Sequence, residues 1–247
     1  MKPESAAASN AVSGTRGRVV RLWRYPVKSM LGEDRAHIDV NERGVEGDRL
    51  FAVRDPNGKF GSGKTTRRFR KIDGLFGFSA TYHQDDPSIV FPDGRRMRGS
   101  DPNVHAALSN TLGQSVTLVR EASISHLDAG PLHLLTTASL AWLRALLPDA
   151  IVDERRFRPN ILVDVPGDTQ VERLWLGKTV CIGAEVRLRV SDLSERCVMV
   201  GLAQADLPDD PRVLRDIGRN AGPHFGVYAE VLIPGRINGG DQLRVNP

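Results

Sequence analysis

Hydrophobic residues in the first 120 positions recur in short alternating runs separated by turn-forming residues. The run RVVRLWRYPVKS (18–29) starts with β-branched residues and ends near a proline, and QSVTLVREAS (114–123) has the same character. DPNG (55–58) and PDG (92–94) are strong turn signals. The pattern is typical of short β-strands, so the first 120 residues are predicted to be mostly β.

A different pattern occupies LHLLTTASLAWLRALLPDA (132–150). Its leucines recur at helical spacing, at Leu140, Leu143, Leu146 and Leu147. Thr136 or Thr137 is suited to the N-cap of this helix, and Pro148 would stop it. DDPRVLRDIGRN (209–220) predicts a second, shorter helix with a proline in its first turn.

The remaining hydrophobic runs in the second half have the length and alternation of strands. They are NILVDV (160–165), TVCIGAEVRLRVSD (179–192), GVYAEVLI (226–233) and DQLRV (241–245), with PGRINGGD (234–241) as a turn-rich link. A β framework with two or three inserted helices predicts a mostly β, α+β fold of the barrel type rather than alternating βαβ units.

Composition limits the class of protein. A chain of 247 residues with 40% hydrophobic content suits one large or two small domains with a sizeable core. No run approaches the roughly 18 apolar residues that a membrane span needs. The opening residues 1–16 lack the apolar stretch of a secretory signal and are predicted to form a disordered tail. We therefore expect a soluble, cytoplasmic protein with no membrane partner.

One stretch, GKFGSGKT (58–65), spells the phosphate-binding pattern G-x-x-x-x-G-K-[ST]. A working loop of this kind links a buried strand to a helix that points at the phosphates. Here the DPNG turn takes up the first glycine, and TRRFRKIDG (66–74) has no apolar stripe at helical spacing. A hairpin turn that runs into a basic surface segment is the better interpretation.

The chain has 34 basic and 30 acidic residues, a formal charge of +4. The basic residues cluster at RRFRK (67–71), GRRMR (94–98) and ERRFR (154–158). Such clusters suit an anionic ligand or partner. Nucleic acid is not expected, because no recognised nucleic-acid motif accompanies them and only 6% of the residues are aromatic.

The cysteines are Cys181 and Cys197, and neither lies in a C-x-x-C pair. Structural zinc and iron–sulfur clusters are excluded, because the latter need about four thiolates. From the residues alone, Cys197 is either a small buried hydrophobic residue or a reactive thiol beside Arg196. Electrons for any redox reaction would have to come from another protein.

Seven motifs follow one another along the chain: WRYPVKSM (23–30), GVEGDRLFAV (44–53), HLLTTASL (133–140), RRFRPNILVD (155–164), ERLWLGKTVCIG (172–183), RCVM (196–199) and FGVYAEV followed by PGRINGGD. Together they resemble the molybdenum-cofactor-sulfurase C-terminal (MOSC) domain family with its N-terminal β-barrel companion. The layout is similar to that of the amidoxime-reducing component and its bacterial relatives. The resemblance implies two β-barrel-like subdomains, residues 17–122 and 123–247, with a few inserted helices.

The resemblance also implies a molybdopterin-type molybdenum cofactor between the two subdomains, with Cys197 as the metal ligand. Thiolate sulfur is the side-chain donor suited to such a metal. The positions that match the family's cofactor contacts are Lys28, Ser29, Arg49, Arg158, Asn160 and Arg196. Thr136 and Thr137 either present hydroxyl and N–H groups to the cofactor or only cap the helix. His133 and Cys181 are interpreted as core residues.

By this resemblance the protein is an oxidoreductase that reduces a small N-oxygenated substrate, with electrons from a separate donor protein docking on the basic runs. A non-redox carrier of sulfur or of the molybdenum cofactor, with a persulfide on Cys197, is the alternative. A barrel with an empty site is the third hypothesis, because Glu195 stands where relatives carry a serine. Its carboxylate would repel an anionic centre unless it turns outward or pairs with Arg196.

Overall fold

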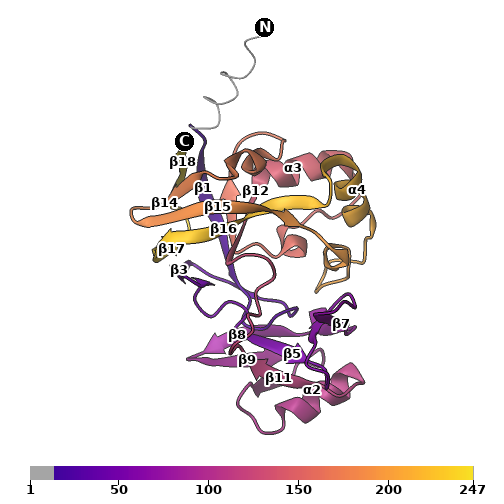
Figure 1. Cartoon of the computed structure of the whole chain (residues 1–247). Helices are drawn as coiled ribbons and strands as arrows, with labels where there is room; N and C mark the ends of the chain where they lie inside the picture. Colours follow the sequence, from indigo (N-terminus) through magenta and orange to yellow (C-terminus); the bar gives the residue numbers. More distant parts are fainter. Residues whose placement is uncertain (1–13, 247) are drawn as a thin grey trace.

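The computed structural model describes residues 14–246, which form two lobes stacked end to end (Figure 1). The larger lobe is a β-barrel flanked by helices, and the smaller lobe is built from short sheets and one helix (Figure 1). Of the tail predicted over residues 1–16, residues 1–13 lie outside the described residues, and Arg16 already belongs to the first strand. No helix in the described part of the chain is long and apolar enough to cross a membrane.

Seven strands of the larger lobe close into a barrel. They are β1 (Arg16–Arg24), β12 (Leu132–Thr136), β13 (Ile161–Asp164), β14 (Thr179–Ile182), β15 (Val186–Glu195), β16 (His224–Ile233) and β18 (Gln242–Asn246). Their order is β13, β12, β16, β15, β14, β18, β1, and β1 pairs back with β13 to close the ring. The mostly β, α+β fold predicted from the sequence is confirmed.

The barrel includes a strand from the beginning of the chain. β1 lies between β13 and β18, and its buried residues alternate up to Val19. A bulge between Val19 and Arg21 then shifts the register, so that Val20 is 42% exposed while Leu22 again points into the barrel. The N-terminal segment is therefore built into the same hydrophobic core as the C-terminal half.

Three short strands form a further sheet beside the barrel: β3 (His37–Asn41), β4 (Gly44–Val45) and β17 (Gly235–Asn238). A further short strand, β2 (Glu33–Asp34), pairs antiparallel with the end of β1. The prediction of a plain turn-rich link over 234–241 is wrong for its first half. Gly235 to Asn238 pair with β3 in register, because Ile237 is buried opposite Ile38.

The smaller lobe packs two sheets and a helix around its own core. The elements are β5 (Phe51–Arg54), β6 (Phe60–Ser62), β7 (Phe69–Lys71), η1 (Leu75–Gly77), β8 (Ser79–His83), β9 (Asp86–Val90), β10 (Arg96–Arg98), α2 (Val104–Leu112) and β11 (Thr117–Arg120). α2 is absent from the sequence prediction, since only Val104 and Leu108 mark its buried face.

The hairpin interpretation of GKFGSGKT is confirmed. β5 and β6 pair antiparallel across a turn in which the Asp55 carboxylate accepts the N–H groups of Asn57 at 3.0 Å and Lys59 at 2.8 Å. The chain then runs to β7 without a helix. β7 lies parallel to β6, which places the basic segment at the junction of the two lobes.

Helices cover one side of the barrel (Figure 1). They are α3 (Thr137–Leu146), α4 (Arg212–Ala221) and the 3₁₀ turns η2 (Glu154–Phe157), η3 (Val171–Trp175) and η4 (Val198–Val200). Both predicted helices are present. α3 ends two residues before Pro148, and Leu143 is fully buried while Leu146 is 38% exposed.

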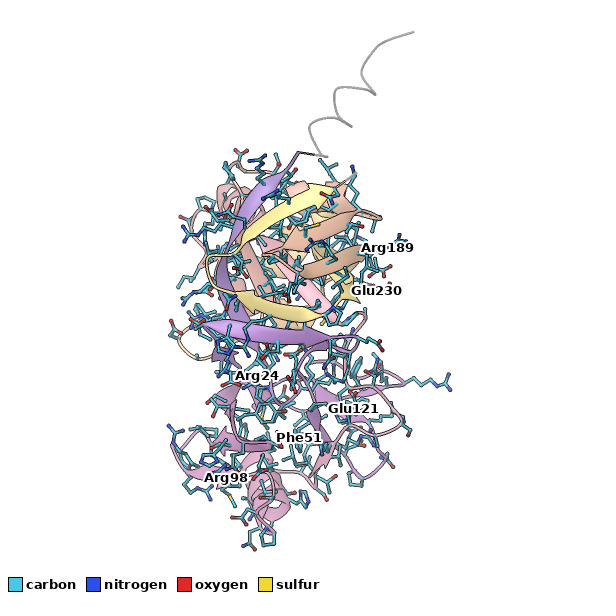
Figure 2. All side chains as sticks on the ribbon, turned by 90° about the vertical axis from the view of Figure 1, so that its left-hand side faces the viewer. Arg24, Phe51, Arg98, Glu121, Arg189 and Glu230 are labelled. Carbon is cyan, nitrogen blue, oxygen red and sulfur yellow. The ribbon has the colours of Figure 1, made fainter. Side chains whose placement is uncertain are left out.

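Figure 2 shows the same two lobes from the side, with Arg24 near the waist between them. On the barrel wall Arg189 of β15 lies directly opposite Glu230 of β16 in the strand register (Figure 2). Opposite charges at such cross-strand positions stabilise pairing on a solvent-facing surface.

Candidate functional site

A cavity of about 480 Å³ is lined by residues of both halves of the chain. It contains every predicted cofactor or metal residue except the two threonines: Lys28, Ser29, Arg49, Arg158, Asn160, Arg196 and Cys197. These positions are separated by up to 169 residues in the sequence, from 28 to 197, and only the folding of β1 into the barrel brings them together.

Lys28 and Ser29 follow β1 where the chain leaves the barrel for the smaller lobe. The Lys28 ammonium is buried, forms an ion pair with the Asp128 carboxylate and lies 5.3 Å from the centre of the Phe69 ring. Burial lowers the pKa of Lys28, and the charge of Asp128 opposes that shift. The Ser29 hydroxyl donates to the Gly61 carbonyl at 2.9 Å.

Arg49 and Arg158 both pack against the ring of Tyr25. Their guanidinium carbons are 4.8 and 4.1 Å from the centre of its ring. Arg49 pairs with Asp48, and Arg158 Nη1 donates to the Met30 carbonyl at 2.6 Å. Burial, together with the charge of Arg49, lowers the pKa of Arg158 to about 10. Its buried Nη2 has no hydrogen-bond partner among the described residues.

Three of these cavity residues hold a left-handed backbone conformation that residues other than glycine rarely adopt. The φ angles are 64° at Ser29, 51° at Arg49 and 54° at Arg158. Only two other non-glycine residues in the described range have positive φ. Backbone strain of this kind tends to gather at functional sites, so its concentration here makes the cavity the candidate functional site.

Asn160 holds two barrel strands together. Its side-chain oxygen accepts the His133 N–H at 3.1 Å, and its amide donates to the Trp23 carbonyl at 3.3 Å. Because Asn160 is fully buried, these bonds fix the cavity wall next to Arg158. Its amide group is already occupied by the fold.

Arg196 and Cys197 follow the end of β15. Arg196 donates to the Ser194 hydroxyl and to the Phe157 carbonyl, both at 2.6 Å, which fixes its charge at the cavity wall. Cys197 is half-buried, and its backbone begins η4. Glu195 is exposed at the same cavity, and Arg196 makes no ion pair with it.

His133 is buried behind Arg196, with its Nε2 3.4 Å from Arg196 Nη1. Burial and the Arg196 charge hold the pKa of His133 well below its usual range, so the imidazole is neutral. The core interpretation of His133 agrees with this burial, although its ring also reaches the cavity wall.

Thr136 and Thr137 do not line the cavity. Thr136 is fully buried, accepts the Ser139 N–H at 3.1 Å as N-cap of α3, and donates to Glu172 at 2.6 Å. Thr137 donates to the Asp164 carboxylate at 2.8 Å. The capping interpretation of Thr136 is confirmed. The hydroxyls of both threonines donate to carboxylates of the protein, Glu172 and Asp164.

Several cavity residues escaped the sequence analysis. Lys64, Arg68 and Phe69 belong to the segment that was expected to be only a basic surface, and Asp128 lies between β11 and β12. Arg68 donates to the carbonyls of Ser125 at 2.6 Å and Leu127 at 2.8 Å, which ties this segment to the cavity wall. The RRFRK cluster (67–71) was the feature of the sequence that could have indicated this part of the cavity wall.

The cavity is strongly cationic. Its acidic residues are Asp128, Asp192 and Glu195, and its basic ones are Lys28, Arg49, Lys64, Arg68, Arg156, Arg158 and Arg196. An excess of fixed, partly desolvated cations around one concave space is suited to an anionic ligand. The fold and site thus define a two-lobed β-barrel protein with a cationic cavity that is lined by one cysteine.

Family models identify the class more closely. The MOSC domain model matches residues 111–244, more than half of the chain, and the MOSC N-terminal β-barrel domain model matches residues 16–90. The chain therefore belongs to the MOSC family, as the sequence motifs predicted. None of the curated proteins compared matches the chain.

The chain is similar to several solved structures at low sequence identity. The YUAD protein of Bacillus subtilis is 14% identical with a TM-score of 0.53, covering 93% of this chain and 95% of that one. YiiM of Escherichia coli is 11% identical (TM-score 0.44; 94% of this chain, 70% of that one). YiiM of Geobacillus stearothermophilus is 16% identical (TM-score 0.37; 63% of this chain, 68% of that one).

Proposed function

We propose that this protein binds a molybdopterin-type molybdenum cofactor in the cationic cavity and acts as an oxidoreductase on small N-oxygenated compounds. Membership of the MOSC family supports the cofactor class. The single observation that carries the proposal is the position of Cys197, the one cysteine that lines a cavity in which basic side chains outnumber acidic ones.

The residues present fit this cofactor. It is an anion with a phosphate end, and the buried Arg158 Nη2, which has no partner among the described residues, is a donor left free for such a group. Cys197 provides the soft sulfur that molybdenum takes from protein. When bound, the group would supply a metal that accepts an oxygen atom from the substrate and is returned to its reduced state by two electrons.

The chain's own residues would bind and orient the cofactor. Lys28 and Arg158 would neutralise its negative charge, and Ser29 offers a hydroxyl oxygen. Arg49 supports Arg158 by donating to its backbone carbonyl at 3.4 Å. To contact the cofactor, the Lys28 ammonium would either break its ion pair with Asp128 or bind the carboxylate and the cofactor together. Asn160 would act through the wall, because its side-chain oxygen and amide already have partners in the fold. Both Arg196 Nη atoms are held by the fold, but its buried Nε has no partner among the described residues and is a further free donor.

The overall reaction breaks the N–O bond and releases the oxygen as water, which requires two electrons and two protons. An electron-donor protein is therefore part of the proposal. Arg67, Arg70 and Lys71 are exposed on the segment that also contributes Lys64 and Arg68 to the cavity. A positive surface of this kind favours docking of an acidic donor.

Elemental analysis of the purified full-length protein tests the proposal. We expect about one molybdenum per chain from a molybdenum-replete host, as for a site with a single metal ligand set. Cys197→Ser should lower the molybdenum content at least tenfold. Cys181→Ser is the matched control, since Cys181 lies in β14 outside the cavity, where the Asn246 amide contacts its sulfur at 3.4 Å.

The sulfur-carrier function makes a different prediction for the same variants. Cys197 is the cysteine that lines the cavity, so its thiolate could accept the outer sulfur of a donor protein's persulfide, whose own thiol leaves, without a metal. Protein that is free of molybdenum but accumulates sulfane sulfur, lost in Cys197→Ser and kept in Cys181→Ser, would replace the oxidoreductase by the carrier. Protein with neither would contradict both functions.

A further inference from the structure

A second cavity of about 300 Å³ adjoins the cationic one. Its walls come from residues 62–77 of the smaller lobe and from residues 199–209, which follow Cys197. Ser62 and Met199 line both cavities. This second space, called the side cavity below, therefore meets the cofactor cavity at a residue two positions after the proposed metal ligand.

Met199 forms the partition between the two spaces. Its sulfur lies 2.9 Å from the backbone nitrogen of Gly63, which donates to it. A Cβ at Gly63 would stand 2.7 Å from that sulfur and 2.8 Å from Leu202 Cδ1. The glycine thus allows Met199 and Leu202 to pack against the smaller lobe, and methionine is an adaptable side chain that can move to admit a ligand.

The wall formed by residues 199–209 is held from behind. The fully buried Arg156 donates to the carbonyls of Pro208 at 2.8 Å and of Val200 at 3.4 Å. These bonds fix both ends of the loop, so the side cavity is preformed. Its size is at the lower end of the range for small-molecule pockets, which limits the ligand to one ring or a short branched chain.

The side cavity differs from its neighbour in charge. Its main wall residues are apolar, namely Ile72, Leu75, Phe76, Met199 and Leu202. The ionisable residues that line it are Asp73 and Asp209, and no lysine or arginine does so. Asp73 is 3.4 Å from Lys71, whereas Asp209 has no ion pair in the described range.

We propose that the side cavity binds a small monocation with an apolar body. Asp209 would face the positive charge, and the apolar wall would cover the body. An anion would instead be drawn to the basic residues of the neighbouring cavity. The binding of the cation does not depend on the proposed function. The further step, in which this cation is the substrate and reaches the metal past Met199, rests on the proposed function.

Methyl-labelled methionine makes the test direct, because the chain has four methionines and, of those that the structure describes, only Met199 lines these two cavities. Molybdenum-free full-length protein is titrated with benzylammonium, benzyl alcohol and phenylacetate, and the methyl resonances are followed by NMR. We expect benzylammonium to shift the Met199 resonance and to bind about five-fold more tightly than benzyl alcohol. Phenylacetate should enter the cationic cavity, which Met199 also lines, so any shift that it causes at Met199 should not depend on Asp209. Met97 should not move. Met199→Leu assigns the signal.

Asp209→Asn should lower the affinity for benzylammonium to that of benzyl alcohol and leave the alcohol unaffected. Asp85→Asn, an exposed residue at the β8–β9 turn, removes the same charge away from both cavities and should change nothing. A Met199 resonance that benzylammonium does not move, or an affinity for benzylammonium that Asp209→Asn leaves unchanged, would overturn the inference. Because the titration needs no metal, its result is independent of the molybdenum analysis.

Discussion

At the scale of single residues, the site depends on close approaches that only particular side chains and backbone angles permit. His133 packs behind Arg196, and its ring lies where a side chain on residue 226 would be. A Cβ at Gly226 would be 2.4 Å from His133 Nε2 and 2.8 Å from the Leu134 carbonyl, and its φ is +81°. Gly226 therefore leaves room for the His133 ring at the cavity wall, although it does not itself line the cavity.

Gly226→Ala should lower the free energy of unfolding by about 3 kcal/mol, from left-handed strain plus the clash with backbone that cannot move. Gly58→Ala is the matched control, because Gly58 has a similar φ of +78° but open space around it. It should cost only about 1 kcal/mol. Urea denaturation measures both variants, and equal losses would show that the contact with His133 is unimportant.

At the scale of elements, the segment between β11 and β12 both joins the lobes and forms part of the cavity wall. Its Asp128 reaches Lys28, its carbonyls bind Arg68, and its His126 packs edge-on against Phe60 with ring centres 4.9 Å apart. The ring of His126 is fully buried, and neither nitrogen has a hydrogen-bond partner in the described range.

Burial lowers the pKa of His126 to about 4, below the value of about 6.5 expected in the unfolded chain. Between these values the unfolded state binds more protons, so stability should fall as the pH drops from about 6.5 to 4, by up to roughly 3 kcal/mol. Denaturation across this range should show that the free energy of unfolding changes less with pH in His126→Phe than in the unchanged protein. Some pH dependence should remain, because the pKa of buried His133 is also lowered. Exposed His83→Gln should leave the slope unchanged.

At the scale of the whole molecule, the two lobes are not independent in sequence. The subdomain boundary that we propose at 122/123 falls in the segment between β11 and β12. β1 precedes this boundary in the sequence, yet it closes the barrel that the residues after the boundary form. Val19 and Leu22 of β1 belong to the barrel core. Cutting at this boundary would leave β13 and β18 with unpaired edges.

A fragment of residues 123–247 is therefore expected not to fold cooperatively. Loss of Val19 and Leu22 alone removes roughly 3–6 kcal/mol of apolar burial, comparable with the whole stability of many domains. Thermal unfolding followed by circular dichroism should show a single transition for residues 14–247 and none for the fragment. A cooperative transition in the fragment would mean that β1 is dispensable.

Much of the fold could be predicted locally. The short strands, the turn at DPNG and the helix capped at Thr136 each follow from a few neighbouring residues, and the order of motifs indicated the family. α2 and β17 could not be predicted in this way. Each is short, and burial against a partner that is distant in sequence stabilises it more than its own pattern does.

The sequence by itself determined the kinds of group available: one thiol beside an arginine, clusters of cations, and strands of a mostly β protein. Only the tertiary structure decided which of these meet. It placed Lys64, Arg68 and Asp128 in the cavity, and turned Thr136 and Thr137 away from it. The physical reason is that spacing along a chain fixes local geometry, whereas the closure of a barrel brings together residues whose separation no local pattern encodes.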